Sequence, residues 1–176
     1  MALQDICTKR LDLIAVTPVC ALSEQVGDGR LDEFTRAKMP ATWPPEHWES
    51  HVFDWLLRRF GEHPDEMGWH RYVALRGTDG GRTLIGTVGA HRSATEPGDC
   101  EIGYGLLQEF QGFGYATEAA MAVMRLVVSQ PGVHTISAQT YPSLPQSIRV
   151  MQKCGMRYVG PGDEATTVRY RWAREG

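Results

Sequence analysis

The sequence lacks the features that direct a chain to a membrane or to nucleic acid. Its 176 residues carry a net charge of −3, so no basic surface for nucleic acid is expected. The start carries Asp5 and no apolar run, which argues against a signal peptide. The longest apolar stretch, 119–128, is interrupted by Arg125 and is too short to span a bilayer. We expect a cytoplasmic protein with neither a membrane nor nucleic acid as a partner.

Metal-binding and disulfide patterns are also missing. No C-x-x-C pair occurs among the four cysteines, which are Cys7, Cys20, Cys100 and Cys154. We expect them to be reduced thiols. His47 and His51 are four residues apart, but HWESH lacks the H-E-x-x-H order and no third ligand is evident. The sequence therefore predicts no metal site.

The chain shows no repeat, low-complexity tract or linker, and 42% of it is apolar, which predicts one domain over 1–176. Alternation predicts strands at 8–16, 69–76, 82–91, 100–107, 133–140, 156–160 and 168–172. Helices are predicted from Thr17-Pro18, at 31–39, at 45–60 with Gly61 ending it, after the glycine-rich turn at 111–116, and from Ser143 to Gly155. Strands alternating with helices indicate an α/β or α+β fold.

The most informative stretch runs from Asp99 to Gln130 and is predicted to be a strand, a glycine-rich turn and a helix. Along the strand, Glu101 shares a face with Gly103 and Gly105, so a ligand could approach the backbone there closely. Small residues in the turn let N–H groups converge where the helix begins. Such a place binds phosphate.

Two common phosphate motifs do not fit this turn. A nucleoside-triphosphate loop requires a lysine after its glycines, and none follows here. A dinucleotide fingerprint requires a third glycine or alanine where Thr117 stands and an acidic residue where Gln139 stands.

A third motif does fit. Gln111, Gly114 and Ala116 match [QR]-x-x-G-x-[GA], and EIGYGLLQEFQGFGYATEA resembles the ribosomal-protein N-terminal acetyltransferase branch of the GNAT (Gcn5-related) N-acetyltransferase superfamily. The later SIRVMQKCGMRYVG, from Ser147 to Gly160, is similar to a second segment of that family. The resemblance implies a mixed, mostly antiparallel central sheet, flanked by helices, whose two central strands splay apart around acetyl-CoA.

The resemblance also implies site residues. Glu101 would be the general base, directly or through a water, although it could instead cap a turn or pair with Arg92. Backbone N–H groups around Leu106 and Leu107 would bind the thioester oxygen and the pantetheine amides. The N–H groups that would bind the pyrophosphate are those of Gln111, Gly112, Phe113, Gly114, Tyr115, Ala116 and Thr117.

The chain departs from the family pattern at two positions. Leu144 stands where an asparagine is usual, and Ser143 is expected to cap the helix in its place. Met151 stands where many members have a tyrosine that reprotonates the departing thiolate. Ser147 would then hydrogen-bond or protonate the cofactor sulfur, although a serine there could equally bond its own backbone.

Together these features predict transfer of an acetyl group from acetyl-CoA, with no metal, to a primary amine by direct attack in a ternary complex. The amine would be a protein N-terminus or a small molecule, and Trp43, His47 and Trp48 could shape its pocket. A non-catalytic acyl-CoA-binding module and a transferase of a longer acyl group are the alternatives. A homodimer is compatible with the resemblance.

Overall fold

The computed structural model describes residues 3–174. Its strands are β1 (Ile6–Cys7), β2 (Leu11–Ala15), β3 (Arg71–Arg76), β4 (Arg82–Arg92), β5 (Asp99–Leu106), β6 (Thr135–Thr140), β7 (Arg157–Pro161) and β8 (Val168–Ala173). Its helices are α1 (Pro18–Val26), α2 (Leu31–Thr35), α3 (Ser50–Glu62), α4 (Tyr115–Val128) and α5 (Pro145–Lys153), with 3-10 turns η1 (Pro64–Glu66) and η2 (Gln108–Phe110). Within residues 3–174, no helix has both the length and the apolar character needed to cross a membrane.

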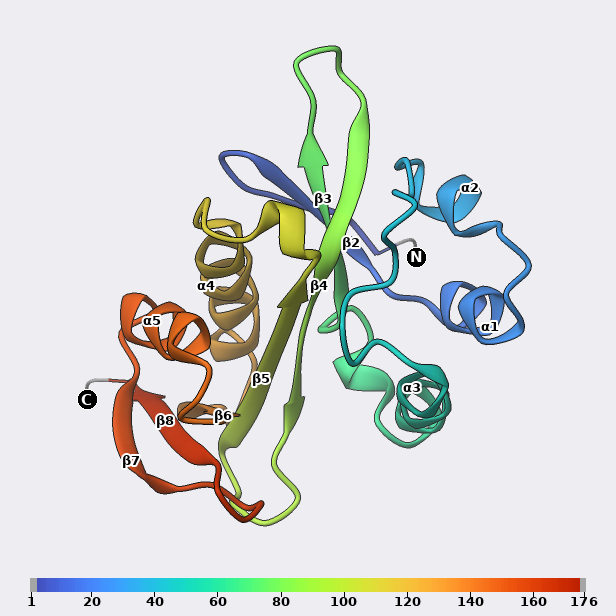
Figure 1. Cartoon of the computed structure of the whole chain (residues 1–176). Helices are drawn as coiled ribbons and strands as arrows, with labels where there is room; N and C mark the ends of the chain where they lie inside the picture. Colours follow the sequence, from blue (N-terminus) through green and yellow to red (C-terminus); the bar gives the residue numbers. More distant parts are fainter. Residues whose placement is uncertain (1–2, 175–176) are drawn as a thin grey trace.

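All eight strands form one sheet in the order β1-β2-β3-β4-β5-β6-β8-β7. Neighbouring strands are antiparallel except β5 and β6, which are parallel. These two pair over only three residues, the last being Glu101 with Ser137, although β5 continues to Leu106. They therefore diverge beyond Glu101 (Figure 1), and the predicted mixed sheet with splayed central strands is confirmed.

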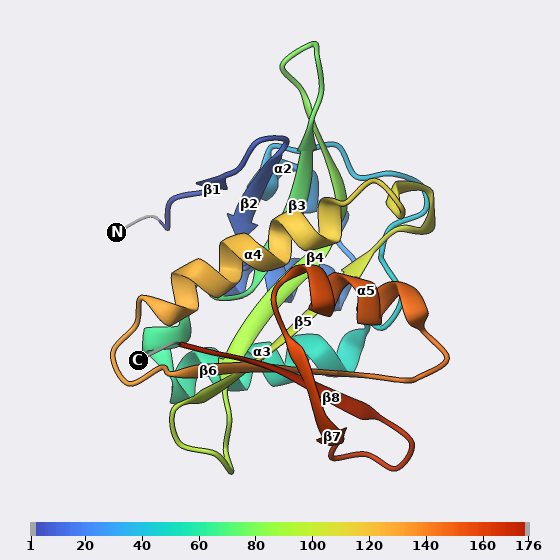
Figure 2. The ribbon, with the colours of Figure 1, turned by 90° about the vertical axis from the view of Figure 1, so that its left-hand side faces the viewer.

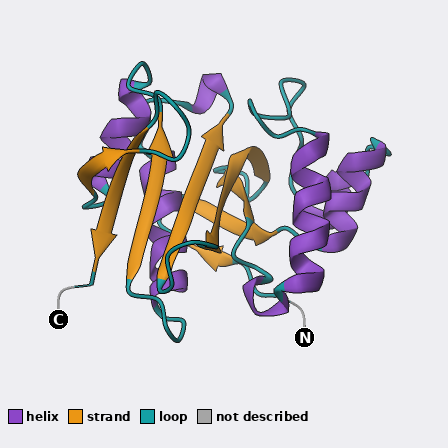
Figure 3. Cartoon of the chain, turned by 90° about the horizontal axis from the view of Figure 1, so that it is seen from below, coloured by secondary structure: helices purple, strands orange, loops and turns teal. Residues whose placement is uncertain are grey.

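Helices cover both faces of this sheet. Helices α4 and α5 lie on one face and α1, α2 and α3 on the other (Figures 1 and 2). Figure 3 shows the strands between these two groups. On the first face, Ile102 of β5 is buried in one core with Ala119, Val123 and Val127 of α4, which lie four residues apart along one side of the helix.

Helix α2 ends at Thr35, earlier than the predicted 31–39. Arg36 adopts a left-handed backbone with φ 52°, and the chain then leaves the helix. The Lys38 N–H donates to the Arg82 carbonyl oxygen at 2.8 Å. A contact with the start of β4, distant in sequence, therefore overrides the helical pattern.

Helix α3 begins at Ser50 rather than at residue 45, and it continues through Gly61, which was expected to end it. The preceding residues form a turn in which the Trp48 N–H donates to the Pro45 carbonyl oxygen at 3.1 Å. The Trp48 indole is buried and donates to Glu24 at 3.0 Å. A helix starting at residue 45 would move the Trp48 indole away from Glu24. The burial of this indole therefore explains why α3 begins later.

The two predicted N-caps differ in outcome. Thr17 caps α1 as expected, since its Oγ1 accepts from the Cys20 N–H at 3.3 Å and Pro18 is the first helical residue. The prediction that Ser143 caps α5 is wrong, because Leu144 is the N-cap and no side chain caps that helix. Pro145, the first residue of α5, has no backbone N–H, so this helix start has one unpaired N–H group fewer that needs a cap.

Candidate functional site

Strand β5 presents two different faces at the point where it leaves β6. Ile102 is buried toward α4, whereas a Cβ on Gly105 would lie 3.7 Å from the Glu46 carbonyl oxygen on the opposite face. A Cβ on Gly103 would meet nothing within 4 Å. The predicted alternation is confirmed, and the glycine face leaves open space next to Glu101.

The backbone of β5 supplies groups to the gap between the diverging strands. The Leu107 N–H donates to the Ile85 carbonyl oxygen at 2.8 Å, so the prediction that it binds the thioester must be corrected. Hydrogen-bonded residues alternate in an antiparallel pair, so the backbone groups of Tyr104 and Leu106 point away from β4. Accordingly, the Leu106 carbonyl oxygen accepts from Gln111 Nε2 at 3.0 Å. Leu106 remains the predicted N–H donor.

The turn before α4 carries a set of unpaired donors. Gly112 and Gly114 have φ of 86° and 83°, a left-handed backbone that glycine adopts without strain. The Gln111 N–H closes η2 on Gln108 at 3.2 Å, but no described residue accepts a hydrogen bond from the N–H groups of residues 112–117. The last three of these belong to the first turn of α4, where the helix dipole adds positive potential. Such a turn suits a bound phosphate.

A side chain from the β1 edge of the sheet holds this turn. Arg10, between β1 and β2, donates from Nη1 to the Phe113 carbonyl oxygen at 2.9 Å and lies 4.4 Å from the centre of the Tyr115 ring. Its Nε and backbone N–H donate to the Glu118 carboxylate, each at 2.7 Å. The Thr8 hydroxyl donates to the same carboxylate at 2.6 Å. The turn and the start of α4 are therefore fixed to the β1–β2 hairpin.

The turn and the gap open into one cavity of about 520 Å³. The predicted site residues that line it are Leu106, Gln111, Gly112, Gly114, Tyr115, Ala116, Thr117 and Ser147. Glu101, Leu107 and Phe113 are not among its lining residues. A hollow of about 560 Å³ between the β1–β2 hairpin and α4 contains none of the predicted site residues.

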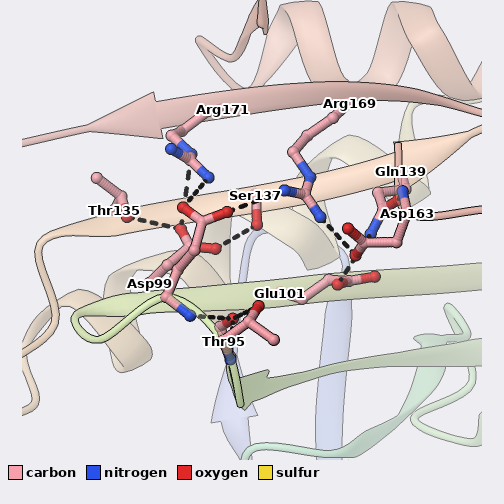
Figure 4. A network of polar contacts seen from close by, with 11 residues as sticks. Thr95, Asp99, Glu101, Thr135, Ser137, Gln139, Asp163, Arg169 and Arg171 are labelled. Atoms are coloured by element: carbon pink, nitrogen blue, oxygen red, sulfur yellow. Dashed lines mark hydrogen bonds and ion pairs between the residues drawn. The ribbon is translucent and has the colours of Figure 1, made fainter. Parts of the chain in front are cut away.

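The Glu101 carboxylate lies where β5 and β6 separate, and it is half-buried. Its Oε2 accepts from Gln139 Nε2 at 3.2 Å (Figure 4). Arg92, considered above as its partner, instead lies 3.6 Å from Asp65 and 3.9 Å from Glu66. Burial raises the pKa of Glu101, and the Gln139 hydrogen bond opposes this rise. A carboxylate with a raised pKa next to open space is suited to accept a proton.

Ser147 meets a second hydroxyl in the cavity wall. The Tyr104 hydroxyl donates to the Ser147 carbonyl oxygen at 3.0 Å and lies 3.3 Å from Ser147 Oγ. Burial raises the pKa of Tyr104 to about 12, so Tyr104 keeps its proton and acts as a hydrogen-bond donor. Met151 is buried and offers no polar hydrogen here. Two hydroxyl groups, those of Tyr104 and Ser147, therefore line the same cavity as Met151.

The loop before α3 forms the opposite wall and is held by one half-buried carboxylate. Glu24 accepts from the indole N–H groups of Trp43 and Trp48 at 3.0 Å and from the Tyr72 hydroxyl at 2.5 Å. His47 of this loop lines the cavity. Of the three residues suggested for the acceptor pocket, His47 faces it, and the two tryptophans position the loop.

No group of three or more His, Cys, Asp or Glu side chains within residues 3–174 could hold a metal ion. His47 precedes the start of α3, so it does not share a helical turn with His51.

Three residues of the site were missed by reasoning from the sequence. Arg10 lies 108 residues from Glu118, and no local pattern links the two. Tyr104 alternates with Glu101 along the strand and was given no role, although a hydroxyl among apolar side chains indicates a nearby partner. Gln139 was considered only as a position where a dinucleotide fingerprint requires an acidic residue. Its contact with Glu101 depends on the pairing of β5 with β6.

Comparisons with known proteins agree with this geometry. The family model described as an acetyltransferase (GNAT) domain matches residues 26–157. An uncharacterized N-acetyltransferase of Bacillus subtilis, YnaD, is 40% identical over 60 residues, which are 34% of this chain and 35% of that protein. The match therefore spans about a third of the length of this relative.

Solved structures share the fold across the whole chain. An acetyltransferase of the GNAT family from Bacillus anthracis superposes with a TM-score of 0.62 at 22% identity, covering 97% of this chain and 98% of that one. RimL, a ribosomal L7/L12 α-N-protein acetyltransferase in complex with coenzyme A, gives 0.63 at 14% identity over 97% and 98%. With the splayed sheet, the phosphate-type turn and the matched family model, the chain belongs to the GNAT acetyltransferase superfamily.

Proposed function

We propose that the protein transfers an acetyl group from acetyl-CoA to a primary amine, which is a protein N-terminus or a small molecule. The observation that carries this proposal is that residues 112 and 114–117, whose N–H groups are unpaired, and the gap beside β5 belong to one cavity. Pyrophosphate would lie on those N–H groups, and the pantetheine arm would run along Tyr104 and Leu106. RimL, which shares the fold, holds coenzyme A in its structure.

The chemistry follows from the two walls of the gap. Glu101, on the glycine face, accepts a proton from the amine, and the neutral nitrogen attacks the thioester carbonyl carbon. The Leu106 N–H stabilises the oxyanion that forms. The C–S bond then breaks, the thiolate departs toward the hydroxyl groups of Ser147 and Tyr104, and the nitrogen loses its second proton to solvent as the amide forms. A thiol pKa of roughly 8.5 lets this group leave with hydrogen bonds alone.

The first test is a thermal melt with acetyl-CoA, succinyl-CoA, CoA or ATP. Acetyl-CoA at about 100 times its dissociation constant adds about 2.7 kcal/mol, a rise in Tm of roughly 5–10 °C for a chain of this size. Thiol release with a panel of amines then identifies the acceptor. A larger shift with succinyl-CoA would favour the longer acyl group, which the open space at Gly103 admits. A shift without thiol release from any amine would favour the non-catalytic module.

The second test replaces the base. Glu101→Gln is expected to lower kcat about 10²- to 10³-fold, because general-base catalysis contributes this much. The thermal shift with acetyl-CoA should stay as in the wild type, since Glu101 does not line the cavity. Because burial raises the pKa of Glu101, wild-type kcat/KM should fall with decreasing pH already above 4.5, and the variant should lose this limb. Unchanged turnover in Glu101→Gln would contradict the assignment.

A further inference from the structure

Gln139 connects Glu101 to the loop between β7 and β8. Its Nε2 donates to Glu101 Oε2 at 3.2 Å and to Asp163 Oδ2 at 2.8 Å, and its Oε1 accepts from the Asp163 N–H at 2.6 Å (Figure 4). A primary amide has two N–H groups and one carbonyl oxygen, so each of its polar groups has a partner. The amide has one orientation, because a flipped amide would point its oxygen at two carboxylates.

The loop is built to approach this amide. A Cβ on Gly162 would lie 2.4 Å from Gln139 Oε1 and 2.1 Å from Thr167 Oγ1, so only glycine lets the loop close on it. Asp163 also accepts from Arg169 Nη2 at 2.5 Å. Arg169 donates in turn to Glu96 at 2.9 Å. The contacts of Gln139 thus belong to a network that joins β5, β6, β8 and the loop (Figure 4).

We propose that Gln139 is a positioning residue that holds the Glu101 carboxylate, favours its ionised form and couples it to the β7–β8 loop. This inference rests on the proposed function, in which Glu101 is the base. In a half-buried site the Gln139 amide N–H is a fixed hydrogen-bond donor, so the Glu101 carboxylate does not depend on a water molecule for this bond. The loop affects the base as well, because Asp163 accepts from the same Nε2 and its charge disfavours the ionised form of Glu101.

Charged groups face Glu101 from several elements. Asp99 on β5 and Asp163 in the loop disfavour its ionised form, and Arg169 on β8 favours it. His91 is its cross-strand neighbour on β4, and burial lowers the pKa of His91, so that imidazole is neutral at pH 7. The amide of Gln139 therefore acts in the same direction as Arg169 and against burial and two carboxylates.

Two variants should shift the pKa of Glu101 in opposite directions. Gln139→Leu removes the donor and should raise the pKa of Glu101, because a hydrogen bond to the ionised carboxylate is lost. Asp163→Ala removes a like charge and frees Nε2 for Glu101, so it should lower that pKa. Asp163 is 68% exposed and its N–H contact persists in the variant, so this protein should fold even where Gln139→Leu does not. Glu164→Ala, at the neighbouring exposed carboxylate, is the control.

The measurement is a pH titration of ¹³C-labelled glutamate carboxyl groups by NMR, with the Glu101 signal assigned by its loss in Glu101→Gln. It needs no acceptor amine, so its outcome is independent of turnover. Opposite shifts for Gln139→Leu and Asp163→Ala, with none for Glu164→Ala, are expected. An unmoved Glu101 signal in Asp163→Ala, or in a folded Gln139→Leu, would overturn the inference. Loss of thiol release in Glu101→Gln would still support the proposed function in that case.

Discussion

At the scale of single residues, two glycines with nearly the same backbone have different surroundings. Gly114 has φ 83° and precedes α4, where the unpaired N–H groups lie. Gly132 has φ 76° and follows α4, in a turn where a Cβ would meet nothing within 4 Å. An alanine at either position adopts the left-handed region at a cost of about 1 kcal/mol. A comparison of alanine variants at Gly114 and Gly132 therefore separates the effect of backbone strain from the effect on ligand binding.

We predict that Gly114→Ala weakens acetyl-CoA binding about tenfold or more, because relaxing the strained φ turns the neighbouring N–H groups away from the phosphate. The new Cβ would lie 3.5 Å from Arg10 Nη2, an ordinary contact, so the protein should fold. Gly132→Ala should lose similar stability and keep full affinity. Calorimetric titration measures the affinities, and urea unfolding measures the stabilities. Equal affinities in the two variants would mean that the turn does not bind the cofactor.

The residues that the sequence predicts well are those whose role depends on near neighbours. Gly114 and Gln111 were recognised because the turn and the start of α4 are encoded within a few positions. Arg10 and Gln139 were missed because their partners come from other strands, and no spacing along the chain indicates which strands will pair. Leu107 was assigned wrongly because a backbone N–H can be used by the sheet itself, which its side chain does not reveal.

At the scale of elements, α4 is fixed at its first turn by the Arg10–Glu118 pair. Arg10→Ala should lower the free energy of unfolding by about 1 to 2 kcal/mol, because Glu118 is only 16% exposed and would lose its charged partner. It should also weaken acetyl-CoA binding several-fold, since Arg10 holds the Phe113 carbonyl oxygen. Urea unfolding and titration measure the two effects. Unchanged affinity with reduced stability would show that Arg10 supports only the fold.

This stabilisation has a defined pH dependence. Burial raises the pKa of Glu118, but hydrogen bonds from Thr8 and Arg10 outweigh it, so the folded-state pKa lies below the usual 4.5. A carboxyl group with a lowered folded-state pKa stabilises the protein above its unfolded pKa and loses this effect as pH falls. The difference between wild type and Arg10→Ala should therefore be full at pH 7 and shrink below about pH 4.5. A difference that is constant down to pH 3 would contradict this account.

Element boundaries were predicted less well than element types. Seven of the eight strands and the five helices follow from alternation and spacing, whereas the two-residue strand β1 was not predicted. Helices α2 and α3 have ends set by contacts far along the chain. Trp48 shows the reason, because its indole is drawn to Glu24 on α1 and the backbone before Ser50 turns to allow this. Local propensity cannot anticipate such a contact.

At the scale of the whole molecule, β6, β7 and β8 join the rest of the sheet through only three residue pairs between β5 and β6. A ligand in the gap would add contacts to both sides of this narrow connection. Backbone groups of Tyr104 and Leu106 that face the gap would gain partners, as would the N–H groups of residues 112–117. Binding should therefore change the protection of backbone amides in a localised way.

We predict that acetyl-CoA slows amide hydrogen exchange most at residues 112–117 and 102–106, because unpaired N–H groups exchange fast until a ligand accepts from them. At about 100 times the dissociation constant, exchange of directly contacted amides should slow up to about 100-fold. The turn at 77–81 projects beyond the sheet at the end of β3 (Figure 1) and does not line the cavity, so it serves as the internal control and should be unaffected. Hydrogen-exchange mass spectrometry measures all three segments in one experiment. Equal slowing in the control turn would indicate general stabilisation, and slowing elsewhere but not at 112–117 would place the phosphate outside the turn before α4.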